Sequence, residues 1–352
     1  MRQPAHGGNL AWAAALAGCP PNAILDFSAS ISPLGPPNSA IAAIKSQIGN
    51  LKHYPDPNYS ELRLALSHFH QLPSEWILPG NGSAELLTLI GRELAQLAAT
   101  ILITPAFGDY YRTLAGYNAN VLECPLSLVI GHWSLTKDKG QRTKDKGLLL
   151  NNPHNPTGKL FTRDSILPYL EQFALVVVDE AFMDFVPPNE EQSLIPVVQE
   201  YPNLVVLRSL TKFYSLPGLR LGYAIAHPDC LAKWQLWRDP WPVNTLAAAA
   251  AIAALQDTEF QQQTWAWLPP ARNQLFQGLA EIPGLQPQAS AANFLLVESQ
   301  ESTSQLQQQL LKSHQILIRD CLSFKELGDR FFRVAVRQES DNQRLLTALK
   351  ES

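Results

Sequence analysis

The chain has 352 residues, of which 46% are hydrophobic and 16% are charged, so it is a globular protein long enough for two domains. Its formal net charge of -4 gives no support to a surface that binds nucleic acid or an anionic membrane. Its four cysteines are far apart and form no C-x-x-C pair, which argues against a metal site or a disulfide scaffold and favours a reduced, cytoplasmic location.

The first 40 residues contain little of a core and are expected to form an N-terminal arm without the layout of a signal peptide. From about 41 to 240, short apolar runs alternate with helical patterns. Continuous apolar runs predict strands buried on both faces, and the alternation predicts an α/β domain with a mostly parallel sheet. The expected strands are 101–103, 148–150, 175–178, 204–207 and 223–225.

The pattern changes after the PWP at 240–242, and residues 241–352 are expected to form a smaller α+β domain. Helices rich in Ala, Gln and Leu run to about residue 279, and strands are expected at 293–297, 316–319 and 331–337. The alanine-rich stretch 246–255 is too short for a membrane span, which takes roughly 20 residues, so a buried helix is predicted there.

A seven-residue repeat lies between the two halves of the first domain. TKDKG at 136–140 recurs at 143–147, and this polarity predicts a solvated loop. A basic binding patch is the less favoured interpretation, because the lysines and aspartates nearly cancel.

Two segments before the first strand are candidate ligand contacts. In HGGN at 6–9, two glycines let the backbone approach a ligand, which makes His6 a candidate, although terminal glycines are often only flexible. Tyr54 lies in a proline-punctuated loop, where its hydroxyl could donate to a phosphate or the ring could simply pack.

Two turns in the first domain have the composition of a ligand site. Gly82 and Ser83 open an apolar helical pattern, where backbone N–H groups can bind an anion, although most such starts are plain turns. Glu85 occupies the third glycine position of a dinucleotide fingerprint, so that interpretation fails. Asn155, in NNPHNPTG at 151–158, follows a buried strand and is expected at the carboxyl edge of the sheet, unless this is an ordinary Asn-Pro turn.

Lys212 is the most informative residue. It follows the apolar run 204–207 and is bracketed by Ser209 and Arg220, while Asp179 ends the preceding strand. An amine that can form a Schiff base, a carboxylate that can pair with a ring nitrogen, and two phosphate ligands together match the needs of pyridoxal phosphate. The alternative for Asp179 alone is a helix N-cap, with Glu180 starting the helix.

Arginines near the predicted strand ends of the second domain could grip a carboxylate or phosphate. Arg319 and Arg333 are the main candidates, and surface salt bridges are the alternative. Arg337 is a further candidate, because positions 333 and 337 would share one face of a strand.

Taken together, these motifs resemble those of fold-type I pyridoxal-phosphate enzymes of the aminotransferase class, over nearly the whole chain. The residues that carry the resemblance are NPTG at 155–158, DEA at 179–181, SLTK at 209–212 and GLRLGY at 218–223. The histidinol-phosphate aminotransferase branch is the most similar group. AHGGN at 5–9, LDFSA at 25–29, PWPVN at 240–244 and FRVAVR at 332–337 favour a decarboxylase of that branch, as do Phe182, where the aminotransferases typically carry tyrosine, and Arg337.

The resemblance implies a large domain with a mostly parallel seven-stranded sheet, a smaller domain and a homodimer with shared active sites. It makes Lys212 the Schiff-base lysine and gives Asp179 the ring nitrogen, Asn155 the ring hydroxyl and Phe107 the ring face. Tyr54 is expected to reach the neighbouring subunit's cofactor. The implied phosphate ligands are Gly82, Ser83, Ser209 and Arg220, and the implied substrate ligands are His6, Asn155, Arg319, Arg333 and Arg337.

The expected activity is decarboxylation of L-threonine O-3-phosphate in cobalamin biosynthesis. Transamination of histidinol phosphate or another amino acid is the alternative, and a non-catalytic binding module is a third possibility that the intact cofactor motifs oppose. The chain departs from the family at Ser32 and His154, where asparagine is usual, and at the repeat 136–147, which replaces a helix and a strand.

Overall fold

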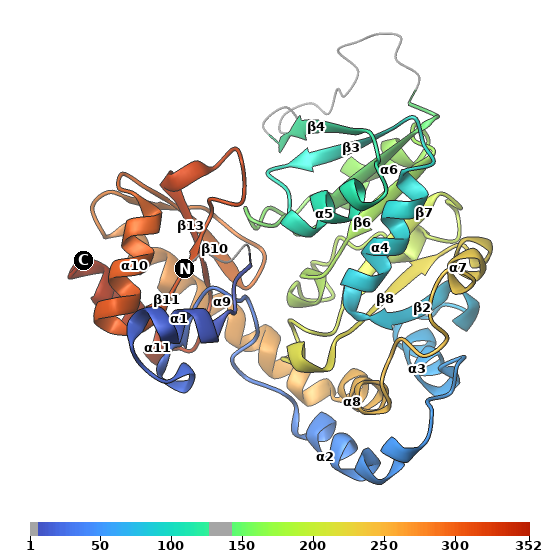
Figure 1. Cartoon of the computed structure of the whole chain (residues 1–352), viewed down its shortest axis with the longest axis horizontal. Coiled ribbons are helices and arrows are strands. Elements are labelled where there is room, and N and C mark those ends of the chain that lie inside the picture. The colour runs from blue at the N-terminus through green and yellow to red at the C-terminus, as the bar shows by residue number, and fades with distance from the viewer. Residues whose placement is uncertain (1–5, 127–142) are drawn as a thin grey trace.

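The computed structural model describes residues 6–126 and 143–352. Within these ranges the larger sheet has seven strands in the order β2-β8-β7-β6-β5-β3-β4, and β8 runs antiparallel to both of its neighbours. This confirms the mostly parallel α/β sheet (Figure 1). Its strands are β2 Ile77–Asn81, β3 Ala99–Thr104, β4 Val121–Pro125, β5 Lys146–Asn151, β6 Leu175–Asp179, β7 Leu204–Ser209 and β8 Leu221–Ala226.

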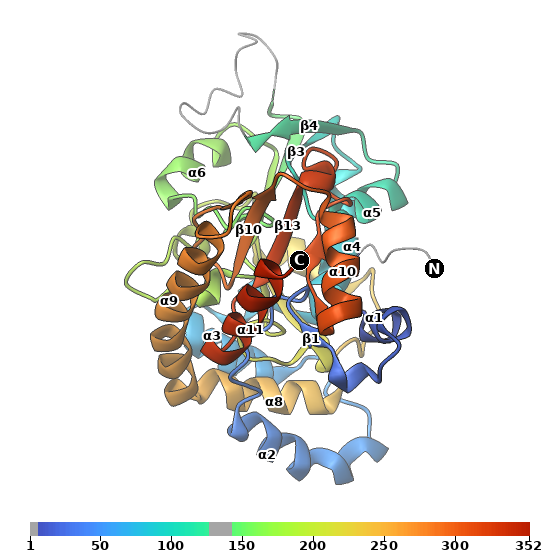
Figure 2. The same cartoon turned by 90° about the vertical axis from the view of Figure 1, so that its left-hand side faces the viewer.

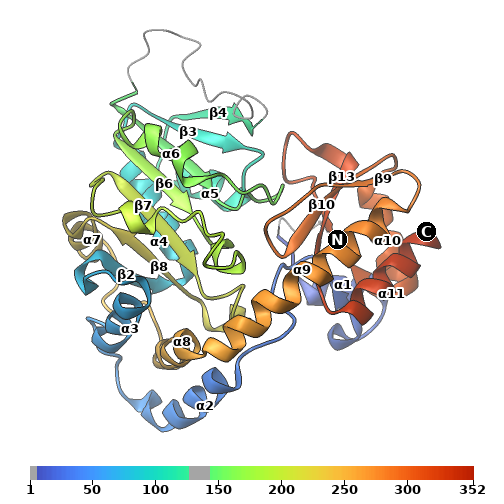
Figure 3. The same ribbon diagram turned by 180° about the vertical axis from the view of Figure 1, so that it is seen from behind.

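Helices cover both faces of this sheet (Figures 1 and 3). Val177 packs in the cluster on one face, whereas Val176 and Val178 pack in the cluster on the other. Both faces of each strand therefore need apolar residues, which explains the uninterrupted runs. One face carries α4 Gly82–Leu94, α5 Gly108–Gly116 and α7 Pro228–Gln235, and the other carries α3 Ser60–His70, α6 Arg163–Leu170 and α8 Thr245–Gln256.

The smaller sheet is antiparallel, in the order β12-β13-β10-β9. Three helices pack with it (Figure 2). In its register Arg319 lies directly opposite Arg333. The strands are β9 Leu285–Pro287, β10 Phe294–Ser299, β12 Arg319–Asp320 and β13 Phe331–Ala335, and the helices are α9 Thr258–Ala280, α10 Thr303–His314 and α11 Glu339–Lys350.

The N-terminal segment packs with the smaller sheet before it crosses to the larger one. Helix α1 (Leu10–Ala17) packs on α10, and β1 (Leu25–Asp26) pairs in parallel with β11 (Ile316–Leu317). Helix α2 (Asn38–Gln47) then packs on α8, which also contacts α3. The domain limits at residues 40 and 240 stay a prediction, and α8 packs with helices of the larger sheet.

The first copy of the repeat, 136–140, lies outside the described residues. For the second copy the expected loop is wrong at its end, because Lys146 and Gly147 begin β5. An added Cβ at Gly147 would lie 2.3 Å from the Leu94 side chain. Gly147 is therefore a buried glycine that lets the strand start beneath α4. Among the helices that the structure describes, none has both the length and the apolar character for crossing a membrane.

Candidate active site

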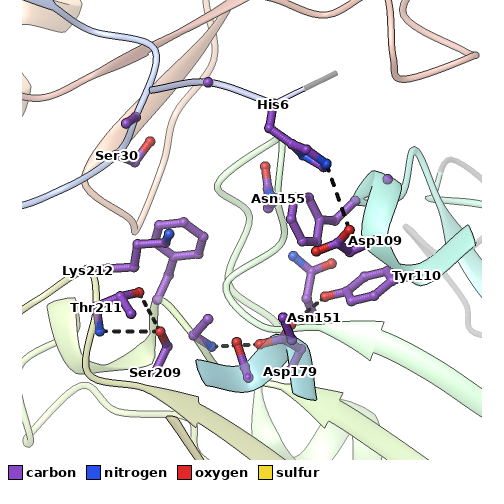
Figure 4. A pocket seen from close by; sticks show the side chains of 18 of the residues that line it. His6, Ser30, Asp109, Tyr110, Asn151, Asn155, Asp179, Ser209, Thr211 and Lys212 are labelled. Atoms are coloured by element: carbon purple, nitrogen blue, oxygen red, sulfur yellow. Dashed lines mark hydrogen bonds and ion pairs between the residues drawn. The ribbon is translucent and has the colours of Figure 1, made fainter. Parts of the chain in front are cut away.

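A cavity of about 240 Å³ opens where the carboxyl ends of the parallel strands face the smaller sheet. Asn151, Asp179 and Ser209 end the neighbouring strands β5, β6 and β7, so the fold places them along one edge. Most of the predicted site residues line this cavity (Figure 4). They are His6, Ser83, Phe107, Asn155, Asp179, Ser209, Lys212, Arg220, Arg319 and Arg333, with Gly82 adjacent to Ser83.

Lys212 lies in the loop after β7, and its backbone carbonyl accepts a hydrogen bond from Ser32 N–H at 3.0 Å. The pKa of the Lys212 amine is lowered to about 8, chiefly by burial and also by the nearby cations Arg333 and Arg220, while Asp179 opposes the shift. A lysine amine with a pKa near neutrality is a nucleophile that loses its proton readily.

Asp179 is buried at the end of β6, where two donors orient its carboxylate. The Tyr110 hydroxyl donates to Oδ2 at 2.8 Å, and Ala181 N–H donates to Oδ1 at 3.0 Å (Figure 4). Burial raises the pKa of Asp179, and these hydrogen bonds oppose the rise. A cation in the cavity would favour its ionised form. The chain continues into a turn and the short 3-10 helix Met183–Phe185, so Asp179 does not start an α-helix.

Sequence reasoning missed Tyr110. Its ring lies edge-on to the Phe107 ring, with centroids 5.7 Å apart. Tyr110 follows Phe107 by three residues at the start of α5. Residues i and i+3 of a helix lie on one side, so this spacing could have indicated that Tyr110 lies on the same side as Phe107.

The start of α4 has the features of an anion site. In the described part of the chain, the side chain of the N-cap residue Asn81 accepts no hydrogen bond from the first turn of α4. The N–H groups of that turn, where Ser83 and Ala84 line the cavity, therefore lack a side-chain cap and could bind an anion. An added Cβ at Gly82 would lie 2.6 Å from a guanidinium nitrogen of Arg220, which explains the glycine. The Ser209 and Thr211 hydroxyls lie 2.7 Å apart beside it. Thr211 was also missed, although it lies in the predicted lysine motif.

Arg333 is one of two buried arginines from the smaller sheet. Its guanidinium donates to Asn155 Oδ1 and, at 3.3 Å, to the Ser28 carbonyl, and it lies 4.8 Å from the centre of the Phe294 ring. Its Nε is buried without a hydrogen-bond partner in the described part of the chain. Burial lowers the pKa of Arg333 to about 10, which marks a cation that has lost much of its hydration.

Arg319 projects from the neighbouring strand and donates to Ser323 Oγ at 2.6 Å. Burial also lowers its pKa. Because the two arginines are opposed in register, their side chains share one face of the sheet, and both line the cavity. Paired guanidinium groups of this kind suit a ligand with carboxylate or phosphate groups.

His6 also lines the cavity, 3.8 Å from Asp109 and with its ring centroid 5.7 Å from that of Phe107. An added Cβ at Gly7 would lie 2.2 Å from the Ser28 carbonyl oxygen, so the glycine permits close packing of this segment. Gly7 therefore allows a close approach to Ser28, and an approach of this segment to a ligand stays a prediction.

Besides Gly82, two predicted residues do not line the cavity. Tyr54 is 79% exposed and stacks on Trp241, with ring centroids 4.5 Å apart. Arg337 pairs with Asp341 at 2.9 Å and donates to the Asp26 carbonyl at 3.3 Å. Strand β13 ends at Ala335, so the expectation that positions 333 and 337 share a strand face is wrong.

The two departures, Ser32 and His154, have structural partners. The Ser32 carbonyl accepts from Ser215 Oγ at 2.6 Å, in addition to the Ser32 contact with Lys212. His154 is fully buried, and its Nδ1 lies 2.8 Å from Thr157 Oγ1. Burial lowers the pKa of His154 to about 3, so it is neutral.

Comparisons with known proteins agree with this fold. The model of the aminotransferase class I and II family matches residues 22–349. The chain is 40% identical to threonine-phosphate decarboxylase of Salmonella typhimurium, over 98% of this chain and 96% of that protein. Histidinol-phosphate aminotransferase from Clostridium acetobutylicum is 29% identical, with a TM-score of 0.82 over 93% of this chain and 98% of that one. L-threonine-O-3-phosphate decarboxylase from Porphyromonas gingivalis, 24% identical, has the same fold, with a TM-score of 0.83 over 92% and 98%.

Proposed function

The chain belongs to the aminotransferase class I and II family, and from that premise we propose that it decarboxylates L-threonine O-3-phosphate with pyridoxal 5′-phosphate as its cofactor. The products are carbon dioxide and (R)-1-aminopropan-2-ol O-phosphate, and the reaction belongs to cobalamin biosynthesis. The carrying observation is that Arg319 and Arg333 lie opposite one another at the cavity that also contains Lys212. A substrate with a carboxylate and a phosphate suits two such cations.

The residues of the cavity fit the cofactor. Lys212 would carry it, Asp179 would pair with the ring nitrogen, and Asn155 would pair with the ring hydroxyl oxygen. Phe107 would pack on the ring. The start of α4, with Gly82 and Ser83, would bind the phosphate together with Ser209 and Arg220. Supporting observations are the uncapped start of α4, the glycine that makes room for Arg220, and a carboxylate fixed by two donors.

Pyridoxal phosphate, when bound, supplies an electron sink for the bond that breaks at the substrate α-carbon. The protein decides which bond that is by orienting the substrate. His6, Arg319 and Arg333 bind the substrate anions, and Phe182 gives the cavity an apolar wall. After carbon dioxide leaves, the α-carbon needs a proton. The Lys212 amine, with a pKa of about 8, can deliver one near neutral pH.

The proposal includes a homodimer in the cytoplasm. Tyr54 and Trp241 form an exposed stacked pair, and Ile48 and Leu51, a few residues before Tyr54 in the chain, are 55% and 57% exposed. An apolar surface of this kind suits a second copy of the chain, in whose cavity Tyr54 would contact the cofactor. The four cysteines are free, which supports a reducing compartment.

One assay separates this reaction from its alternative. The holoenzyme is incubated with L-threonine O-3-phosphate, and released carbon dioxide is measured. A parallel reaction contains histidinol phosphate and 2-oxoglutarate, and glutamate is measured. The proposal expects carbon dioxide in the first reaction and no glutamate in the second. Glutamate without carbon dioxide would replace it with the aminotransferase function.

A further inference from the structure

A loop of the smaller domain lines the cavity and also contacts the larger sheet. This loop, residues 321–328, joins β12 to β13, and we call it the clasp. Its base is fixed to the smaller sheet, because Cys321 and Phe324 pack with Leu296. The next residue, Asp329, accepts a hydrogen bond from Ser304 N–H at 2.7 Å. Its middle forms part of the cavity, since Ser323 and Phe324 line it.

The tip of the clasp contacts the larger sheet through two charged residues. Lys325 Nζ lies 2.9 Å from Glu123 Oε1 on β4 and 4.7 Å from the centre of the Tyr111 ring. Glu326 accepts a hydrogen bond from the Thr104 hydroxyl at the end of β3. The clasp is therefore attached to both sheets.

The same loop holds one of the cavity arginines. Arg319 Nη2 donates to Ser323 Oγ at 2.6 Å. A guanidinium group has several rotatable bonds before it, so a fixed acceptor decides where it points. The position of that acceptor depends in turn on the anchors at Lys325 and Glu326.

We propose that the clasp positions Arg319 for the anionic group of the substrate, and that its attachment to Glu123 and Thr104 holds the cavity closed around that group. This inference rests on the proposed function, because it takes Arg319 as a substrate ligand. Ser323 is a positioning residue that acts through Arg319. Lys325 is an anchor that acts through the loop.

The anchor is tested by a charge swap. Lys325→Glu opposes two carboxylates at Glu123, and the double variant Glu123→Lys with Lys325→Glu restores an ion pair in reverse. Lys312→Glu, an exposed position on α10, is the matched control for the change in charge. The pair is exposed, so its loss should leave the fold intact.

The expected result is a selective effect on substrate binding. Lys325→Glu should raise KM for L-threonine O-3-phosphate by roughly fivefold to tenfold with kcat changed by less than about twofold. The double variant should recover, and Lys312→Glu should match the wild type. Ser323→Ala should raise KM in the same way, and Ser323→Thr, which keeps the hydroxyl, should restore it. Equal behaviour of Lys325→Glu and Lys312→Glu would overturn the anchor.

A second measurement needs no turnover. Binding of inorganic phosphate to the holoenzyme is followed by calorimetry, and amide exchange is followed over residues 322–327. Lys325→Glu and Ser323→Ala should both bind phosphate more weakly, and the clasp amides of Lys325→Glu should exchange faster than those of the wild type. If the wild type releases no carbon dioxide, the proposed reaction fails while this measurement still decides the clasp. Unchanged phosphate binding and exchange would refute the clasp and leave the reaction untouched.

Discussion

Arg319 and Arg333 are directly opposed on two adjacent antiparallel strands, and both side chains are almost completely buried. Like charges in opposed positions destabilise a sheet. Burial adds to this cost, and it lowers the pKa of both guanidinium groups. A bound anion removes the repulsion, so this local conflict is evidence for a ligand with negative charge at this position.

Replacing Arg333 with lysine tests that reading. Arg333→Lys keeps the charge but loses the planar fork that contacts both Asn155 and the Ser28 carbonyl. KM for L-threonine O-3-phosphate should rise by about tenfold or more, equivalent to ~1.4 kcal/mol. Arg337→Lys is the control, because Arg337 pairs with Asp341 outside the cavity. Similar KM values for the two variants would contradict the assignment.

Lys212→Ala should abolish decarboxylation and the visible absorbance band of the bound cofactor, since the amine proposed to carry the cofactor is gone. Absorbance spectra of the purified protein check this directly. Lys233→Ala, on the distant helix α7 where Lys233 pairs with Glu93, should keep both. A persistent band in Lys212→Ala would show that another lysine carries the cofactor.

The depressed pKa of Lys212 predicts how the stability of the cofactor-free protein depends on pH. The folded protein releases the lysine proton near pH 8, whereas the unfolded chain keeps it to about 10.5. The unfolded state binds more protons in this window, so folding stability rises with pH there, by at most about 1.4 kcal/mol per unit. Urea denaturation should show this rise relative to Lys212→Met. A constant difference between the two proteins from pH 8 to 10.5 would exclude the shift.

Tyr110→Phe removes one of the two donors to Asp179 while keeping the ring against Phe107. A hydrogen bond to a charged group contributes about 1.5–3 kcal/mol, so kcat should fall roughly tenfold to a hundredfold. Steady-state kinetics of the holoenzyme measure it. Tyr117→Phe, at the partly exposed end of α5, should be silent. An unchanged kcat in Tyr110→Phe would mean that Ala181 N–H alone orients the carboxylate.

Shared sites in a homodimer predict complementation between two inactive variants. Tyr54→Ala damages the contact with the partner's cavity, and Lys212→Ala inactivates its own cavity. A heterodimer of the two has one cavity with both residues intact. Equal mixing after dissociation and reassembly should recover about a quarter of the wild-type sites. If the mixture is no more active than its components, Tyr54 has no role in a partner's site.

Much of the site follows from strand topology, which the sequence predicts well. The apolar runs 175–178 and 204–207 are unambiguous, and parallel strands bring their carboxyl ends to one edge, so Asp179 and Ser209 had to be neighbours. The two arginines of the smaller domain were also located. The sequence did not predict that they lie directly opposite one another, because the register of the two strands depends on where β12 begins.

The missed residues share a physical reason. Glu326 accepts from Thr104, which lies 222 residues away in the sequence, and no local pattern records such a contact. Ser323 is only four residues from Arg319, but their contact depends on how the loop after β12 turns back, which the sequence does not show. Arg337 was misplaced because β13 ends two residues earlier. Lys146 and Gly147 looked polar and flexible, but packing beneath α4 decides their structure.

The order of the site along the chain has a consequence for protein synthesis. Apart from Tyr54, the proposed cofactor ligands lie between Gly82 and Arg220, whereas the proposed substrate arginines lie on strands that end at Ala335. A ribosome therefore synthesises the residues of the cofactor half more than a hundred codons before Arg333 is made. During that interval the nascent chain contains Lys212 but lacks the pair of guanidinium groups. The arginine pair is the last part of the site to be synthesised.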